Sequence, residues 1–385
     1  MDRLLFTADH DDYRRTVRGF VDREVSPNLT RWDEERLIDR PVWLAAGKQG
    51  IIGLSVPDEY GGGGEPDYRY QVVVMEELAR AGAAALASSF SLQDNIVTPY
   101  IRDLGTEEQR RRWLAGLASG QLVGAIAMTE PGAGSDLQGV RTAAVRDGGE
   151  WVINGQKTFI TSGINADFVI VVARTDPGAG ARGFSLIVVE TGTAGFTRGR
   201  KLDKVGLHAQ DTAELFFSDV RVPAVNLLGT EGHGFMHLME RLPLERLAIA
   251  TAALASAQAV LTETTRYCFE RKAFGRPVGD FQNTRFQLAE MSTELDVTRA
   301  YHDAAVLALN SGRLSAVDAA KAKWWTTELQ KRVIDRCLQL HGGYGYMLEY
   351  PVARAYIDSR IQTIYGGTTE IMKEIIGRDI ARAHG

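Results

Sequence analysis

The 385-residue sequence predicts a multidomain α+β fold in which a helical domain, a β domain and a helical bundle follow one another along the chain. Two changes in the period of the hydrophobic pattern carry this prediction. Apolar residues have helical spacing in residues 1–122, form short strand-like runs in 123–230, and regain helical spacing in 231–385. The chain is also too long for one ordinary core, so we expect three domains with these boundaries.

The first segment shows apolar residues three and four positions apart, which is typical of amphipathic helices. Examples are Val17, Phe20, Val21 and Val25. The four glycines at Gly61–Gly64 interrupt this pattern after Pro57. No Lys-Ser or Lys-Thr pair follows them, so we interpret the run as a turn rather than a phosphate-binding loop.

The middle segment contains closely spaced β-rich runs separated by glycine and proline. Trp151–Ile153 leads into Asn154-Gly155, and Thr158–Ile160 follows, which predicts a hairpin with its turn at Asn154-Gly155. Further runs begin at Phe168, Phe184 and Ala213. Strands so close together in sequence favour an antiparallel β-barrel or sandwich.

The last segment has long apolar stripes at helical spacing. One comprises Leu288, Met291 and Leu295, and another comprises Trp325, Leu329, Val333, Cys337 and Leu340. Stripes of this length predict an antiparallel bundle of long helices.

Composition excludes several functional classes. The net charge of −5 leaves no basic surface for nucleic acid. The two cysteines, Cys268 and Cys337, rule out a disulfide framework and have no metal-ligand spacing, so we expect no metal site. The N-terminus carries acidic residues early, unlike a signal or transit peptide. No apolar run reaches the length of about 18 residues that a membrane span needs. We therefore expect a cytoplasmic protein of bacterial type.

The stretch MTEPGAGSD, Met128–Asp136, is the strongest candidate for a binding loop. It follows a strand-like run and is rich in glycine, so its backbone amides and the hydroxyls of Thr129 and Ser135 can face a polar group such as a phosphate or a ring carbonyl. It does not match GxGxxG, which argues against a nicotinamide site. Taken alone, the stretch could also be an irregular loop without a ligand.

Other segments of the sequence strengthen the interpretation of this stretch as a binding loop. The sequence contains NGQKTFIT ending at Thr161, RKAFG from Arg271, LQLHGGYGY from Leu338 and IYGGTTEIMKEIIGR from Ile364. Together with MTEPGAGSD, in this order and spacing, they resemble the acyl-CoA dehydrogenase family over nearly the whole chain. KLDKVGLHAQDTAELFF from Lys201 and LPLERL from Leu242 most resemble its long-chain branch. The resemblance implies a helical domain, an antiparallel β-barrel and a four-helix bundle, assembled as a homotetramer built from two dimers.

The resemblance also implies FAD as the cofactor. One group of residues would line the flavin and its side chains: Ile126, Ala127, Met128, Thr129, Gly134, Ser135, Phe159, Ile160 and Thr161. The family often has Trp where Phe159 stands, and the hydroxyl of Thr161 would bond the flavin N5. A second group would reach the FAD of a neighbouring subunit: Arg271, Phe274, Gln282, Gln339, Leu340, His341, Gly342 and Gly343. Thr368, Thr369 and Glu370 would close over the cofactor.

Two positions in the sequence could carry the catalytic base. Many family members carry a glutamate in a C-terminal Y-E-G-T pattern, but this chain reads Tyr365-Gly366-Gly367-Thr368. The long-chain and isovaleryl branches instead place the base in an L-x-x-E-R-L context, which implies Glu245. The structural alternative for Glu245 is an acid in the first turn of a helix opened by Pro243. We expect Gly366 to leave room for the Glu245 side chain and to offer its N–H to the thioester carbonyl.

The implied reaction is α,β-dehydrogenation of acyl-CoA to trans-2-enoyl-CoA, with electrons passed to an electron-transfer flavoprotein. A buried carboxylate has a raised pKa and so suits removal of the α-proton. The substrate would contact Ser135, Met236, Arg246, Gly366 and Gly367.

Three alternatives remain. The same fold could act on acyl-carrier-protein thioesters or as an acyl-CoA oxidase, although the chain lacks the extra C-terminal domain of typical oxidases. It could also be a non-catalytic FAD-binding partner subunit, against which the presence of Glu245, Arg271 and Thr161 argues. Acyl chain length is not determined by side-chain identity alone, though the region of Phe90–Asn95 is expected to contribute to the cavity wall.

Overall fold

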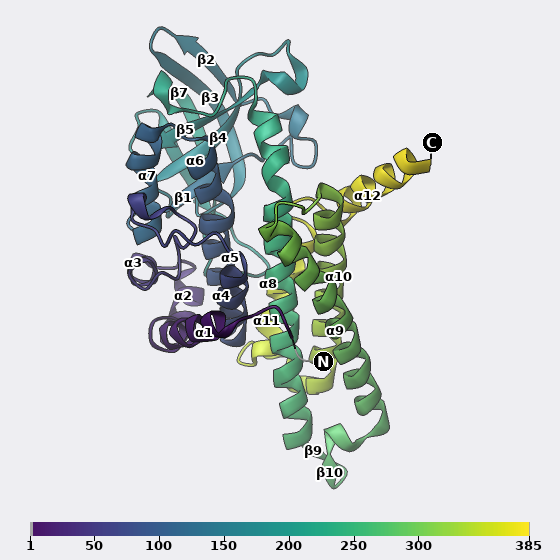
Figure 1. Cartoon of the computed structure of the whole chain (residues 1–385). Coiled ribbons are helices and arrows are strands. Elements are labelled where there is room, and N and C mark those ends of the chain that lie inside the picture. The colour runs from purple at the N-terminus through teal and green to yellow at the C-terminus, as the bar shows by residue number, and fades with distance from the viewer. Residues whose placement is uncertain (1–2, 385) are drawn as a thin grey trace.

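The computed structural model describes residues 3–384 and shows the three parts in the expected order (Figure 1). Residues 1 and 2, which belong to the N-terminal segment considered above, and residue 385 lie outside the described residues. The helical domain and the β domain lie side by side along one flank of the long bundle helices. The predicted fold class is thereby confirmed, and we retain 122/123 and 230/231 as proposed domain boundaries.

The N-terminal helices enclose a core of large apolar side chains that includes Trp32, Trp43 and Phe90. Burial of such side chains is the main favourable term that holds the short helices together. Two helices of this domain, α4 and α5, pack against the long helix α8. The helices are α1 (Ala8–Phe20), α2 (Leu29–Glu35), α3 (Arg40–Lys48), α4 (Arg69–Arg80), α5 (Ala84–Leu92), α6 (Thr98–Leu104) and α7 (Glu107–Ser119), with a π-helical turn at Gln93–Val97 between α5 and α6.

The β domain is one connected sheet with the strand order β6-β7-β3-β2-β4-β5-β8. Its ladders are antiparallel except for the parallel pairing of β1 with β4 and a single parallel pair between β2 and β4. The strands are β1 (Gly124–Ala127), β2 (Ala143–Asp147), β3 (Glu150–Thr161), β4 (Phe168–Arg174), β5 (Phe184–Glu190), β6 (Phe196–Lys201), β7 (Thr212–Pro223) and β8 (Leu227–Leu228).

The prediction of a hairpin turn at Asn154-Gly155 is wrong. β3 runs continuously through both residues, and the register with β7 shifts between Ile153 and Gly155, which marks a β-bulge. The Asn154 side chain accepts a hydrogen bond from the Asp219 N–H of β7 at 2.8 Å. The true hairpin turn joins β2 to β3 at Gly148, whose φ of +59° suits glycine.

The C-terminal domain is built on three long helices, with two shorter ones packed against α10. They are α8 (Gly234–Glu270), α9 (Gln282–Asn310), α10 (Ala316–His341), α11 (Pro351–Ser359) and α12 (Thr369–His384). A small hairpin of β9 (Lys272–Ala273) and β10 (Arg276–Pro277) joins α8 to α9 at the end of the bundle remote from the β domain (Figure 1).

Helix α8 is long and apolar enough to cross a membrane by length and composition, contrary to the run-length argument from the sequence. However, 67% of its most apolar window is buried inside the chain, which is the environment of a core helix. Burial rather than length therefore argues against a membrane span.

Candidate active site

Glu245 lies within α8, eleven residues after the helix begins at Gly234. Pro243 is inside the helix and does not open it, so the reading of Glu245 as a first-turn acid is wrong. The Glu245 side chain is buried, with 3% of the residue exposed. A buried carboxyl away from a helix end is costly, so its retention needs a reason other than the helix dipole.

The Glu245 carboxyl has one hydrogen-bond donor among the described residues. The hydroxyl of Tyr100 on α6 donates to Oε1 at 3.1 Å. Burial raises the pKa of Glu245 to about 7, against the opposing effects of Tyr100 and of the cations Arg246 and Arg241. A carboxyl with a pKa near neutrality is available both to take and to hold a proton at physiological pH.

Arg246 follows Glu245 and is also buried, with 6% exposed. Its Nε has no hydrogen-bond partner among residues 3–384. Burial lowers the pKa of Arg246, and the neighbouring Glu245 carboxylate opposes this effect. A buried guanidinium with a free N–H is costly without a ligand, so Arg246 is suited to a polar substrate group, as the sequence predicted.

The two glycines opposite the base have left-handed backbone conformations, with φ of +64° at Gly366 and +97° at Gly367. A Cβ on Gly366 would lie 2.2 Å from Cδ1 of Ile249, one turn after Glu245 on α8. We expected Gly366 to leave room for the Glu245 side chain. The structure instead places Ile249 in the space beside Gly366. No side chain fits at position 366 without strain.

Lys323 of α10 fixes this glycine segment from the other side. Its buried ammonium donates to the carbonyl oxygen of Gly367 at 2.6 Å. Burial, together with the charge of Arg246, lowers the pKa of Lys323 to about 8. With the Gly367 carbonyl held in this way, the orientation of the preceding peptide group is restricted.

The MTEPGAGSD loop is fastened to β3 by a buried ion pair. The Nζ of Lys157 donates to Oε1 of Glu130 at 2.8 Å and to the carbonyl oxygen of Met128 at 3.1 Å. The Glu130 carboxylate also accepts from the N–H groups of Arg141 at 2.7 Å and Thr142 at 2.9 Å. These contacts fix the base of the loop, while Gly132, Gly134 and Ser135 are exposed and Ala133 is buried.

A second bulge in β3 turns Phe159 outward beside this loop. Its φ is +59°, the register with β7 shifts between Lys157 and Ile160, and its side chain is 68% exposed. Ile160 is buried in the β core, so only its backbone can face a ring placed there. Ile126 and Ala127 of β1 are also core residues, whereas Met128, Thr129 and Thr161 are partly exposed.

The predicted adenosine-side residues lie elsewhere on the chain. Arg271 and Phe274 belong to the β9–β10 hairpin region and Gln282 begins α9, at the end of the bundle remote from the β domain (Figure 1). Phe274 is 95% exposed. Gln339–Gly343 close α10 near Arg271, whose guanidinium lies 5.5 Å from the Tyr344 ring. One chain therefore does not bring this group to its own MTEPGAGSD loop.

The remaining predicted residues fall at the margins of the site. Met236 lies on α8 with 46% exposed. Thr368, Thr369 and Glu370 follow the glycine pair at the start of α12, where Thr369 donates to Glu328 at 2.7 Å. His341 is buried, stacks on Tyr267 at 4.2 Å, and its Nδ1 lies 2.9 Å from the Cys337 carbonyl oxygen, so its ring is held within its own chain.

Sequence reasoning missed Tyr100, Ile249 and Lys323. Each meets the site from a different helix, and no local pattern marks such a partner. Lys157 had a detectable signal, because a lysine within an otherwise β-rich run is unusual if its side chain points inward.

Comparisons with known proteins agree with this arrangement. Models of the N-terminal, middle and C-terminal domains of acyl-CoA dehydrogenase match residues 7–121, 125–220 and 232–381. The long-chain specific acyl-CoA dehydrogenase of Sus scrofa mitochondria is 49% identical over 380 residues, which cover 98% of this chain and 88% of that protein. The chain belongs to the acyl-CoA dehydrogenase family. Family membership confirms the resemblance and the prediction of an oxidoreductase acting on a CH–CH group.

Two solved structures extend the comparison. The acyl-CoA dehydrogenase of Geobacillus kaustophilus superposes with a TM-score of 0.96 at 48% identity, covering 98% of this chain and 100% of that one. A glutaryl-CoA dehydrogenase of Mycobacterium smegmatis in complex with FADH2 gives a TM-score of 0.91 at 31% identity, covering 98% and 96%.

The residues around the MTEPGAGSD loop fit a flavin. A Cβ on Gly132 or Gly134 would have no heavy atom within 4 Å, so the loop backbone is open on one side. The exposed Phe159 ring beside it offers an apolar surface to a flat ring system.

Proposed function

We propose that this chain is an FAD-dependent acyl-CoA dehydrogenase that converts acyl-CoA to trans-2-enoyl-CoA with Glu245 as the base. The observation that carries the proposal is the pairing of a buried Glu245, with its pKa raised to about 7, with a glycine at position 366, where a φ of +64° would strain any side chain. The C-terminal position thus supplies no carboxyl, and in this proposal the buried carboxyl on α8 is the base.

Glu245 removes the α-proton of the thioester in this mechanism. Its raised pKa makes the carboxylate a stronger base, and Tyr100 limits the rise by donating to Oε1. The proton lost by the substrate is then held on the Glu245 carboxyl. Burial of Glu245 excludes water that would otherwise exchange this proton.

The thioester carbonyl must be polarised for the α-proton to become acidic. The Gly366 N–H is the donor that this chain offers, and Lys323 stabilises the segment by holding the Gly367 carbonyl oxygen. Arg246, with its unpaired Nε, would bind a polar part of the substrate. Met236 and Ser135 would border the entrance.

FAD would be held by the MTEPGAGSD loop, Phe159 and Thr161, and when bound it supplies the acceptor for the β-hydride. The Arg271–Gln282 group and Gln339–Gly343 would bind the FAD of a neighbouring subunit, because they lie far from this chain's own loop. This division supports sites that are completed between subunits, and we propose the homotetramer that the family resemblance implies. An electron-transfer flavoprotein is the proposed electron acceptor.

Anaerobic reduction of the bound flavin tests the proposal. The purified protein is titrated with butyryl-CoA, octanoyl-CoA and palmitoyl-CoA, and bleaching of the flavin absorbance is followed. We expect Glu245→Gln to keep FAD and to lose bleaching by a factor of at least about 100. Glu240→Gln, at an exposed carboxyl of the same helix, is the control. Rapid bleaching by Glu245→Gln would refute the assignment, and rapid peroxide formation in air would favour an oxidase.

A further inference from the structure

A cavity of about 730 Å³ lies along α8 between Thr251 and Thr264, after Glu245 in the helix. Ala252, Ser256 and Ala259 line it from α8, at helical spacings. Opposite them, Ala84, Ala87 and Ser88 line it from α5. Small side chains on both helices leave the space, whose volume is typical of ligand pockets.

The cavity begins about two helical turns from Glu245, which is not itself among the lining residues. Ala252 follows Glu245 by seven residues on α8, roughly 10 Å along the helix axis. Gln362 lines the cavity and accepts from the Tyr365 hydroxyl at 3.0 Å, and Tyr365 precedes Gly366. The cavity is therefore placed to receive the part of an acyl chain that lies beyond the thioester.

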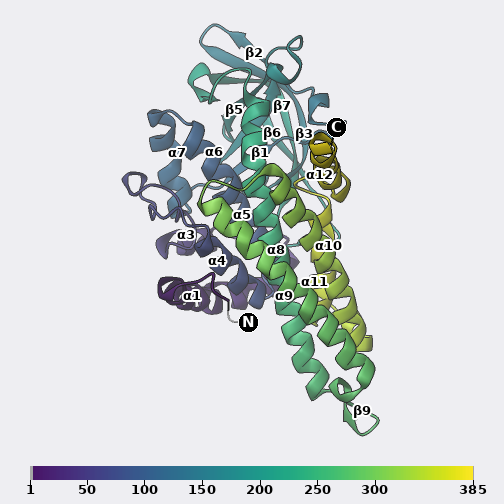
Figure 2. The same ribbon diagram turned by 45° about the vertical axis from the view of Figure 1, so that its right-hand side comes forward.

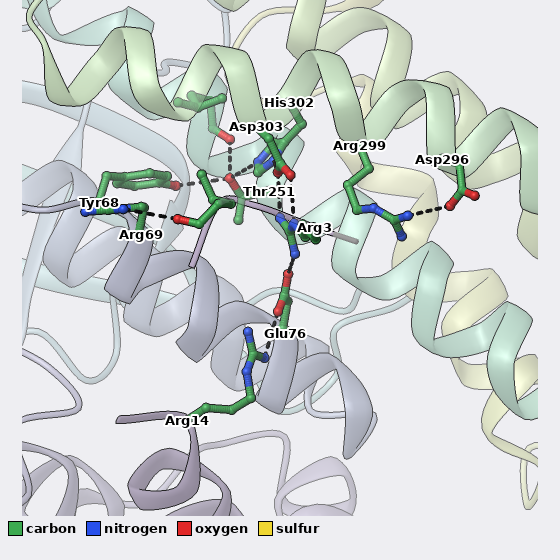
Figure 3. A network of polar contacts seen from close by, with 12 residues as sticks. Arg3, Arg14, Tyr68, Arg69, Glu76, Thr251, Asp296, Arg299, His302 and Asp303 are labelled. Carbon is green, nitrogen blue, oxygen red and sulfur yellow. Dashed lines mark hydrogen bonds and ion pairs between the residues drawn. The ribbon is translucent and has the colours of Figure 1, made fainter. Parts of the chain in front are cut away.

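Polar groups on the α4 and α9 side of the cavity are mutually satisfied (Figure 3). The Thr251 hydroxyl lies 2.8 Å from Nε2 of His302, donates to the Leu247 carbonyl and accepts from Tyr68 at 3.2 Å. Beyond them, Arg3 is paired with Asp303 and Glu76. These groups leave no hydrogen-bonding capacity that calls for a ligand.

Gln330 of α10 differs from them. It lines the same cavity, is 2% exposed, and its Oε1 has no hydrogen-bond partner among residues 3–384. A buried carboxamide whose oxygen is unpaired is costly unless a ligand or water meets it, even though charged side chains such as Arg299 and Asp358 also line this cavity. Gln330 lies seven residues beyond Lys323 on α10, roughly 10 Å along the axis from the glycine segment.

We propose that Gln330 is a specificity residue that binds a hydroxyl group in the distal half of a long acyl chain. This inference rests on the proposed function, because it takes the cavity as the acyl site. The small residues of α5 and α8 admit the hydrocarbon, and the Gln330 carboxamide can both accept from and donate to an alcohol. A saturated chain would leave that amide unpaired, so it is the poorer ligand.

The test compares palmitoyl-CoA with palmitoyl-CoA analogues that carry one hydroxyl at successive positions of the distal half. Anaerobic flavin reduction gives the rate, and calorimetry on the flavin-loaded protein gives the Kd. We expect one or two adjacent hydroxyl positions to be favoured about three- to tenfold over palmitoyl-CoA, the effect of one hydrogen bond. Gln330→Leu should remove or invert this preference, while Leu329→Met, a core change beside it, should keep it.

The outcomes separate this inference from the function on which it rests. If palmitoyl-CoA itself fails to reduce the flavin, the proposed function fails. If palmitoyl-CoA works but no hydroxyl position is favoured in the wild-type protein, the role of Gln330 is refuted without any variant. A preference for a hydroxylated chain that survives Gln330→Leu would also refute the role of Gln330. Equal affinity for palmitoyl-CoA and its hydroxylated analogues would refute it too, and would mean that an ordered water bonds the Gln330 amide.

Discussion

The Tyr100 hydroxyl donates a 3.1 Å hydrogen bond to Oε1 of Glu245 across a sequence separation of 145 residues. This contact joins the helical domain to the bundle at the proposed base. It favours the ionised carboxylate, whereas burial disfavours it, and the balance places the Glu245 pKa at about 7. The pH dependence of the reaction therefore depends on a residue that no sequence motif identifies.

Replacing Tyr100 with Phe tests this balance. The variant loses the donor, so the pKa of Glu245 rises further above 7. We expect the pH at which kcat/KM reaches half its maximum to move upward by about 0.5–1 unit, with the two proteins converging at high pH. Tyr13→Phe, which removes a buried hydroxyl bonded to Gly50, is the control. A downward movement of the pH profile would contradict the proposed role of the hydrogen bond.

The same pKa predicts a pH-dependent stability cost of Glu245. In the unfolded chain the carboxyl ionises near pH 4.5, but in the folded protein it holds its proton to about pH 7. The contribution of Glu245 to the stability of the wild-type protein therefore falls as pH rises through this window, by about 3 kcal/mol in all. Glu245→Gln cannot ionise, so its advantage should be absent below about pH 4.5 and complete above about 7.

Urea unfolding of both proteins at a series of pH values measures this difference. Glu240→Gln, at an exposed carboxyl on α8, should show no comparable gain. An advantage of Glu245→Gln that is constant with pH would mean that packing, not ionisation, sets the cost.

The close approach of Ile249 to Gly366 predicts that a substitution of Gly366 lowers the free energy of unfolding. Gly366→Ala should cost about 2 kcal/mol or more, because it adds a Cβ at φ +64° and places it against Ile249 Cδ1. In a Gly366→Ala/Ile249→Val double variant the methyl in conflict is absent, so part of the loss should be recovered. Denaturant unfolding measures both.

Gly61→Ala is the control that measures the cost of the left-handed backbone without a steric contact. Gly61 has φ +81°, and its Cβ position has open space around it. If Gly366→Ala costs no more than Gly61→Ala, the contact with Ile249 is not restrictive.

The domain order could be predicted from the sequence, because the hydrophobic period is a local signal. The MTEPGAGSD motif is equally local, and its role at the flavin stays a prediction. The Asn154-Gly155 hairpin could not, since a bulge and a turn demand the same backbone freedom and only pairing with β7 distinguishes them. Pro243 likewise indicated a helix start, yet α8 continues through it. Tyr100, which donates to Glu245, comes from α6, and Lys323, which donates to Gly367, comes from α10, so their positions depend on tertiary packing.

The buried Lys157–Glu130 pair should control the shape of the flavin loop. Lys157→Met leaves the Glu130 carboxylate buried without its counter-ion, so we expect a loss of about 3–5 kcal/mol in unfolding free energy and weaker FAD binding. A Lys157→Met/Glu130→Gln variant removes both charges and should recover part of the stability. Unfolding and fluorescence titration with FAD measure the two effects. Arg221→Met, at an exposed pair with Glu150, should cost no more than about 1 kcal/mol. If Lys157→Met is equally mild, the pair does not hold the loop.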